Sequence, residues 1–121
     1  MQPRGRPRSN AFRIQLVARG AGTVHLAASG DLDLGTAGYL RRALAEVGAS
    51  EALLLDLRGV AFIDCAAMRV LEQAGADRGR GFTLVPPPAQ VQRVLQVAGL
   101  ERTLNFVRAP LRAVSTVRAA A

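Results

Sequence analysis

The stretch of the chain that decides its fold is LLLDLRGVAFIDCAAMRVL, residues 53–71. Residues 53–57 form a short and nearly unbroken apolar run, which is typical of a central strand covered on both faces. Arg58 and Gly59 predict a tight turn after this strand, and Asp64 is in position to act as the N-cap of a following helix. We therefore expect a helix N-terminus at the carboxyl edge of a sheet. Ligands and partner proteins often bind at this edge. The apolar residues of that helix share one face: Ala67, Val70, Leu71 and Ala74.

On the N-terminal side of this stretch, apolar residues first alternate with polar ones and then recur at helical spacing. The alternation in residues 12–16 and 24–26, on either side of a Gly-Ala-Gly turn, predicts an antiparallel hairpin. Asp33 then stands as the N-cap of a helix that Gly48 closes. This part of the chain predicts two strands followed by a helix.

On the C-terminal side, the pattern predicts two further strands and two further helices. Residues 82–85 predict a strand, and three prolines lead from it into a helix that ends at Gly99, in the manner of a Schellman stop. Residues 104–107 predict a last strand, and residues 110–120 predict a final helix. The complete order, ββαβαβαβα, predicts the α/β class, with a mixed sheet of four to five strands and helices packed on it.

The positive charge of the chain is concentrated at its two ends. All sixteen basic residues among the 121 are arginines, and the formal net charge is +7. Residues 14–101 hold eight of these arginines and all nine carboxylates, so the formal charge of this middle part is −1. Residues 1–10 combine prolines, glycine and arginines without a large aliphatic residue, which predicts a disordered basic arm. We expect a single domain over residues 11–121.

The composition argues against several classes of function. One cysteine and one histidine provide neither an internal disulfide nor the ligands of a zinc site. The chain has no Gly-rich phosphate loop and no Gly-x-Ser-x-Gly motif, so we expect no catalytic residues, no cofactor and no enzymatic activity. No apolar stretch approaches the roughly 20 residues of a membrane helix, and arginines interrupt the one candidate for a signal peptide. We expect a cytoplasmic protein without membrane insertion.

Three motifs in the order found here resemble those of a known family. Residues 56–71, DLRGVAFIDCAAMRVL, resemble the signature of STAS domains of the anti-sigma-factor antagonist type, in which a similar strand and turn lead to Asp-Ser-Ser-Gly-Leu. Residues 30–33, with Thr36 and Ala37, are similar to the Gly-Glu-Leu-Asp entry to the first helix of that family. Residues 91–100 resemble its Val-x-x-Val-Leu-x-x-x-Gly-Leu segment. The resemblance covers residues 12–107 and implies a STAS-like fold for the single domain.

The resemblance also implies a function. Antagonists of this family bind an anti-sigma factor, often a serine-kinase-like ATPase, through the N-terminus of the second helix, and thereby release the sigma factor. The kinase phosphorylates the serine after the aspartate, which adds about −1.5 to −2 charges to the interface. Here Cys65 occupies that position, so we expect no switching by serine phosphorylation. The residues expected at the partner contact are Asp31, Asp33, Asp64, Cys65, Ala66, Ala67 and Arg69.

Several alternatives remain open at this point. A STAS subunit of a lipid-transport ABC complex would share the fold but bind the transporter ATPase, and a nucleic-acid-binding role would depend on the arginine-rich ends. Binding of nucleic acid is not expected, because the middle of the chain is nearly neutral and has few aromatic residues. Self-association as a homodimer is open. Asp64 serves either as a helix cap or as a partner contact, or as both, and Cys65 is either a reactive thiol or a small filler.

Overall fold

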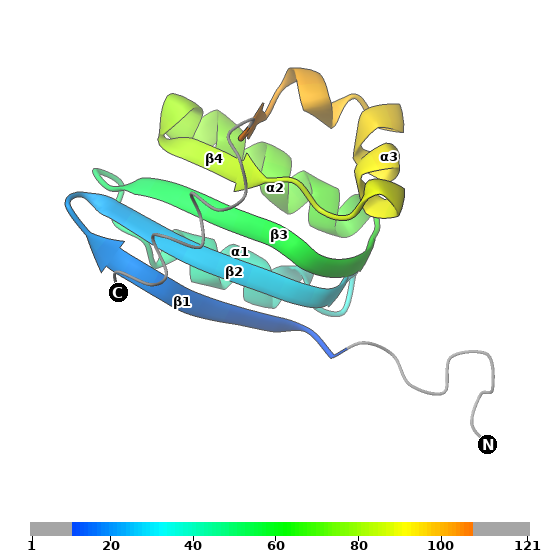
Figure 1. The fold of residues 1–121 in the computed structure, drawn as a ribbon, viewed down its shortest axis with the longest axis horizontal. Coiled ribbons are helices and arrows are strands. Elements are labelled where there is room, and N and C mark those ends of the chain that lie inside the picture. The colour runs from blue at the N-terminus through cyan, green and yellow to red at the C-terminus, as the bar shows by residue number, and fades with distance from the viewer. Residues whose placement is uncertain (1–10, 108–121) are drawn as a thin grey trace.

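The computed structural model describes residues 11–107, which form a five-stranded mixed sheet (Figure 1). The strands lie in sequence order: β1 (Arg13–Gly20), β2 (Thr23–Leu32), β3 (Ala52–Ile63), β4 (Phe82–Val85) and β5 (Asn105–Phe106). β1 pairs with β2 in antiparallel orientation, and the other neighbouring strands are parallel. The predicted order of elements and the mixed sheet are confirmed for this part of the chain. The predicted arm at residues 1–10 and the predicted final helix at residues 110–120 lie outside the described residues.

Three helices connect the parallel strands. Helix α1 (Ala37–Ala45) and helix α2 (Cys65–Arg78) lie side by side on one face of the sheet. Helix α3 (Ala89–Val97) lies near the carboxyl end of β4 (Figure 1). Two short 3-10 turns, Gly79–Gly81 and Leu100–Arg102, follow α2 and α3. Gly99 has a φ of 84°, which is the left-handed conformation that the predicted helix stop requires. None of the helices within residues 11–107 is both long and apolar enough to cross a membrane.

The hydrophobic core lies between the sheet and the pair α1 and α2. Leu53, Leu55 and Leu57 of β3 point into it and are at most 1% exposed. Leu40 of α1 and Leu71 of α2 are completely buried in the same core. Burial of one such side chain contributes about 1.5–3 kcal/mol. The apolar run that begins the decisive stretch therefore forms the centre of the fold, as the sequence predicts.

The predicted tight turn at Arg58 and Gly59 is wrong, because β3 continues through these residues to Ile63. Between the pairs Ala27–Asp56 and Ser29–Gly59, β3 advances by three residues while β2 advances by two, and a second shift of the same kind follows at Phe62. A strand with an extra residue bends and twists without leaving its sheet. The break in the apolar pattern that suggested a turn therefore marks a bulged strand.

A local ion pair and a close approach of two strands accompany this bulge. The carboxylate of Asp56 accepts hydrogen bonds from the backbone N–H of Arg58 at 2.9 Å and from its guanidinium at 2.7 Å. Burial raises the pKa of Asp56, but the hydrogen bonds and charge of Arg58 outweigh burial and hold that pKa below its ordinary value. A Cβ at Gly59 would lie 2.8 Å from the Cβ of Ser29, so the glycine permits close contact with β2.

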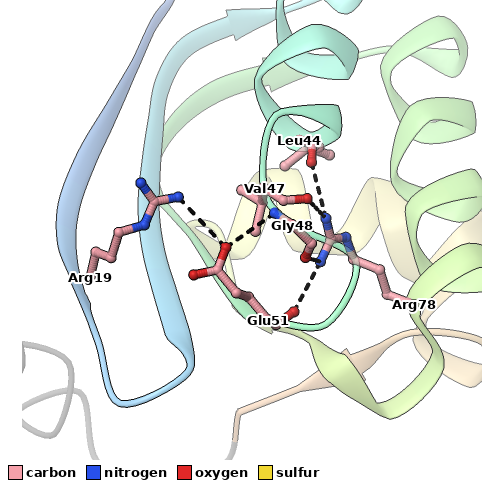
Figure 2. A network of polar contacts seen from close by, with 6 residues as sticks. All are labelled: Arg19, Leu44, Val47, Gly48, Glu51 and Arg78. Atoms are coloured by element: carbon pink, nitrogen blue, oxygen red, sulfur yellow. Dashed lines mark hydrogen bonds and ion pairs between the residues drawn. The ribbon is translucent and has the colours of Figure 1, made fainter.

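The end of α1 is held by an arginine of α2 (Figure 2). Nη2 of Arg78 donates hydrogen bonds to the carbonyl oxygens of Val47 at 2.6 Å and Leu44 at 3.2 Å, and Nη1 donates to that of Glu51 at 3.1 Å. The side chain of Glu51 accepts a bond from the backbone N–H of Gly48. The last carbonyls of a helix have no partner inside the helix, and Arg78 provides one. This network fixes the position of α1 relative to α2.

Candidate functional site

Asp64 forms the N-cap of α2, as the sequence predicts. Its backbone is extended, with φ −121° and ψ −176°, and its Oδ1 accepts a hydrogen bond from the backbone N–H of Ala67 at 3.2 Å. Its own backbone N–H donates to the carbonyl of Leu32 at 3.1 Å. The start of α2 is therefore joined to the carboxyl end of β2 as well as to that of β3.

The segment between β2 and α1 is a turn held by reciprocal hydrogen bonds. The backbone N–H of Asp33 donates to Oγ1 of Thr36 at 2.9 Å, and the backbone N–H of Thr36 donates to Oδ1 of Asp33 at 3.1 Å. This exchange has the pattern of a capping box. The helix itself begins at Ala37, with Thr36 in the N-cap position, which is later than predicted. Asp33 therefore stabilises the turn that leads into α1.

One carboxylate joins these two segments. Oδ2 of Asp64 accepts a hydrogen bond from the backbone N–H of Leu34 at 3.0 Å, while Oδ1 caps α2. Residues that are 30 positions apart in the chain thus form a single surface. Both segments were predicted from their own sequences, but the bond between them arises only in the folded chain.

The structure divides the predicted contact residues by depth. Cys65 and Arg69 are exposed, and Asp33, Asp64 and Ala66 are partly exposed. Two further predicted residues lie beneath this surface, since Asp31 is 4% exposed and Ala67 is completely buried. The carbonyl of Asp31 accepts a hydrogen bond from Oγ1 of Thr36, and Ala67 donates its N–H to Asp64. These two residues hold the surface in place from below.

Sequence reasoning missed a groove that continues from this surface between α1 and α2. We call it the α1–α2 groove; its volume is about 620 Å³, and Leu34, Tyr39, Arg41, Arg42, Arg69 and Val70 line it. Leu34 is 79% exposed and Tyr39 is 59% exposed, so two large side chains of the groove lie open to solvent. The sequence did contain a signal for this groove. Neither Leu34 nor Tyr39 falls on the apolar face predicted for the first helix, so both side chains are expected to lie outside the core.

Asp64→Ala is expected to lower the free energy of unfolding by about 2 kcal/mol. The change removes the helix cap, which contributes about 1 kcal/mol, and the bond to Leu34, which contributes a similar amount. The midpoint of thermal unfolding should fall by roughly 8–16 °C. Hydrogen exchange should show faster exchange at the amides of Leu34 and Ala67.

A matched control for this variant is Asp77→Ala. Asp77 is exposed near the other end of α2 and accepts one side-chain bond from Gln73. Its removal should change stability by no more than about 0.5 kcal/mol. If the two variants unfold at the same temperature, Asp64 does not hold the two segments together.

Comparisons with known proteins agree with this geometry. The family model described as "Mlab, STAS domain" matches residues 16–110. The crystal structure of an anti-sigma factor antagonist from Mycobacterium paratuberculosis is 25% identical in sequence, with a TM-score of 0.70 over 91% of this chain and 95% of that chain. No curated protein sequence matches this chain.

Two further solved structures share the fold at lower identity. The phosphorylated form of the Bacillus cell fate determinant SpoIIAA is 18% identical, with a TM-score of 0.59 over 89% of this chain and 100% of that chain. The murine Slc26a9 anion transporter is 21% identical, with a TM-score of 0.63 over 84% of this chain and only 18% of the transporter. The family match spans most of the chain, and the fold agrees with it in element order and sheet topology. This chain therefore belongs to the STAS domain family.

Proposed function

We propose that this chain is an anti-sigma-factor antagonist that binds an anti-sigma factor through the N-terminus of α2. The observation that carries the proposal is the double role of Asp64, which joins the turn at residues 33–36 to the start of α2. The 25% identity to the mycobacterial antagonist, over nearly the whole of both chains, supports it. Such a preformed surface binds with little ordering cost.

The chemistry of this surface favours binding rather than catalysis. Its accessible side chains are an aliphatic one at Leu34, a thiol at Cys65 and a guanidinium at Arg69, flanked by the carboxylates of Asp33 and Asp64. Within residues 11–107, no group of three or more His, Cys, Asp or Glu side chains is arranged to hold a metal ion. We therefore assign the chain a regulatory binding role.

Regulation by serine phosphorylation is not part of the proposal. Cys65 stands at the phosphoacceptor position, and no serine, threonine or tyrosine lies between Ser50 and Thr83. A serine-kinase-like partner therefore has no hydroxyl to modify on α2. The antagonist would stay competent to bind in the presence of ATP. The amount of anti-sigma factor that it binds would then depend on its own concentration.

The test is a hydrogen-exchange footprint of the full chain with the anti-sigma factor or serine-kinase-like ATPase that co-purifies with it. We expect slower exchange at residues 33–36 and 65–69 and unchanged exchange in α3, which serves as the internal control. Phosphopeptide mapping after incubation with ATP should find no phosphate on α2. Protection confined to other elements, or a phosphorylated α2, would contradict the proposal.

A second candidate is a STAS subunit of a lipid-transport ABC complex. The match to the family model that carries the name Mlab favours it. In that case the same surface would bind the ATPase of a transporter. The nature of the co-purifying ATPase separates the two candidates, since an ABC ATPase supports transport and a kinase-like ATPase supports sigma-factor regulation.

A further inference from the structure

The α1–α2 groove runs along both helices, well beyond the N-terminus of α2. A second section of about 460 Å³ continues from it toward the other end of the helices, and the two sections share Arg41, Val70 and Gln73. The floor is apolar along its whole length: Ala37, Leu44, Val47, Val70 and Ala74. Since α1 has nine residues, this floor is about 13 Å long, which corresponds to two to three turns of a helix.

The charge on the rim of the first section has one sign. Arg41 and Arg42 of α1 and Arg69 of α2 are exposed and line this section, and no carboxylate lines it. The ion pairs found within residues 11–107 join Arg19 to Glu51 and Arg58 to Asp56, so neither involves these three guanidinium groups. These three exposed guanidinium groups are therefore available to pair with the carboxylates of a bound partner.

The apolar part of the rim is held in place before any partner binds. The ring of Tyr39 stacks against that of Phe12, with 6.5 Å between the centroids, and the guanidinium of Arg42 lies 5.8 Å from the centre of the Tyr39 ring. Tyrosine and arginine are the residues that most often contribute the binding energy of protein interfaces. Side chains that are already ordered lose less entropy on association.

We propose that the α1–α2 groove binds an acidic amphipathic helix of the partner protein. The apolar residues of that helix lie on the floor between α1 and α2, and its Glu or Asp side chains pair with Arg41, Arg42 and Arg69. This mode is the helix-in-groove type of recognition, and arginine pairs with carboxylates through two parallel hydrogen bonds. The inference rests on the proposed function and extends its contact from the start of α2 along both helices.

The same observations disfavour other occupants. A symmetric dimer would place the groove of one copy against the groove of the other, so that the arginines would face one another. Nucleic acid would use the arginines but would leave the apolar floor and the exposed side chain of Leu34 without a partner. An acidic helix satisfies both the charge and the apolar surface.

The experiment uses two synthetic lactam-bridged helical peptides, each about 14 residues or roughly four turns long. They share one aliphatic face and carry either glutamates or lysines beside it. Titrated into the isotope-labelled full chain, the Glu peptide should shift the amide signals of α1 and α2 around the groove. It should bind at least about tenfold more tightly than the Lys peptide at low salt.

Variants of the rim test the assigned charges. Arg41→Glu/Arg42→Glu/Arg69→Glu should reverse the preference between the two peptides, and Arg69→Gln alone should weaken binding of the Glu peptide a fewfold. Arg93→Glu, on the exposed surface of α3, is the matched control and should have no effect. The footprint of the partner protein at residues 33–36 and 65–69 tests the docking proposal, whereas peptide binding to the native chain tests this inference, so failure of one is distinguishable from failure of the other.

Four results would overturn the inference. The first is equal binding of both peptides or binding of neither, and the second is binding whose amide shifts lie away from α1 and α2. The third is competition for the groove by duplex DNA or by phosphatidylglycerol vesicles, with the same dependence on Arg41, Arg42 and Arg69. The fourth is a concentration-dependent shift of the same amides without peptide, which would identify a second copy as the occupant.

Discussion

Cys65→Glu is expected to weaken binding to the proposed anti-sigma-factor partner by about a hundredfold. Cys65 is the first residue of α2, is exposed, and directly follows the Asp64 carboxylate. A second carboxylate there must lose its water when the partner docks, and it lies beside a charge of the same sign. Like charges placed side by side in an interface cost several kcal/mol of binding free energy, and about 2.7 kcal/mol corresponds to a hundredfold change in affinity.

The same substitution should leave folding intact. A glutamate in the first turn of a helix interacts favourably with the positive end of the helix dipole, by about 0.3–1 kcal/mol. The thermal midpoint of Cys65→Glu should therefore equal or exceed that of the native protein while its affinity falls. This combination separates a binding defect from unfolding.

Calorimetry with the purified partner measures the effect, and Cys65→Ala is the control. The alanine variant keeps a small side chain at the same position, so its affinity should stay within about a factor of two of the native value. If the glutamate variant binds as tightly as the native chain, the N-terminus of α2 is not the interface. The STAS fold would stand, but the antagonist mechanism would not.

Arg78→Met is expected to lower the free energy of unfolding by about 3 kcal/mol. Bonds from a charged donor contribute about 1.5–3 kcal/mol, and the shortest of those that the change removes joins Arg78 to the carbonyl of Val47 at 2.6 Å. Arg78 donates to the carbonyls of Leu44, Val47 and Glu51, so its removal affects the end of α1 and the following loop together (Figure 2). The thermal midpoint should fall by roughly 12–24 °C.

Two substitutions show whether the geometry of the guanidinium matters. Arg78→Lys keeps the charge but not the planar fork of donors, so its stability should lie between those of the native chain and Arg78→Met. Arg80→Met, two residues further on at an exposed position, should change stability by no more than about 0.5 kcal/mol. A loss below about 1 kcal/mol in Arg78→Met would mean that water replaces the arginine at these carbonyls.

These two residues also connect stability with the groove. Arg78 fixes the far end of α1 against α2, and Asp64 fixes the turn before α1 against the start of α2. The spacing of the two helices is thus set by the N-cap residue of α2 at one end and by the last residue of α2 at the other. If the hydrogen bonds of either Arg78 or Asp64 are removed, we expect the groove to lose its shape before the sheet unfolds.

The sequence by itself determined the elements and their order. The alternation of residues 12–16, the apolar run of residues 53–57 and the three-to-four spacing in α2 each reflect which face of one segment is buried, and this information is local. Asp64 and Gly99 acted at helix ends as predicted, because a cap or a left-handed glycine satisfies backbone groups within a few residues. The family resemblance rested on the same local patterns and is confirmed.

The tertiary structure alone decided which predicted residues reach the surface and what they face. Arg58 and Gly59 lie in a bulged strand instead of a turn because β2 supplies pairing partners through to the end of β3. Asp31 is buried at the end of β2, where the turn before α1 bonds to its carbonyl, and Ala67 is buried on the face of α2 that packs into the core. The bond from Leu34 to Asp64 and the α1–α2 groove each join residues about 30 positions apart, and the energy of such contacts exists only once the chain between them has folded.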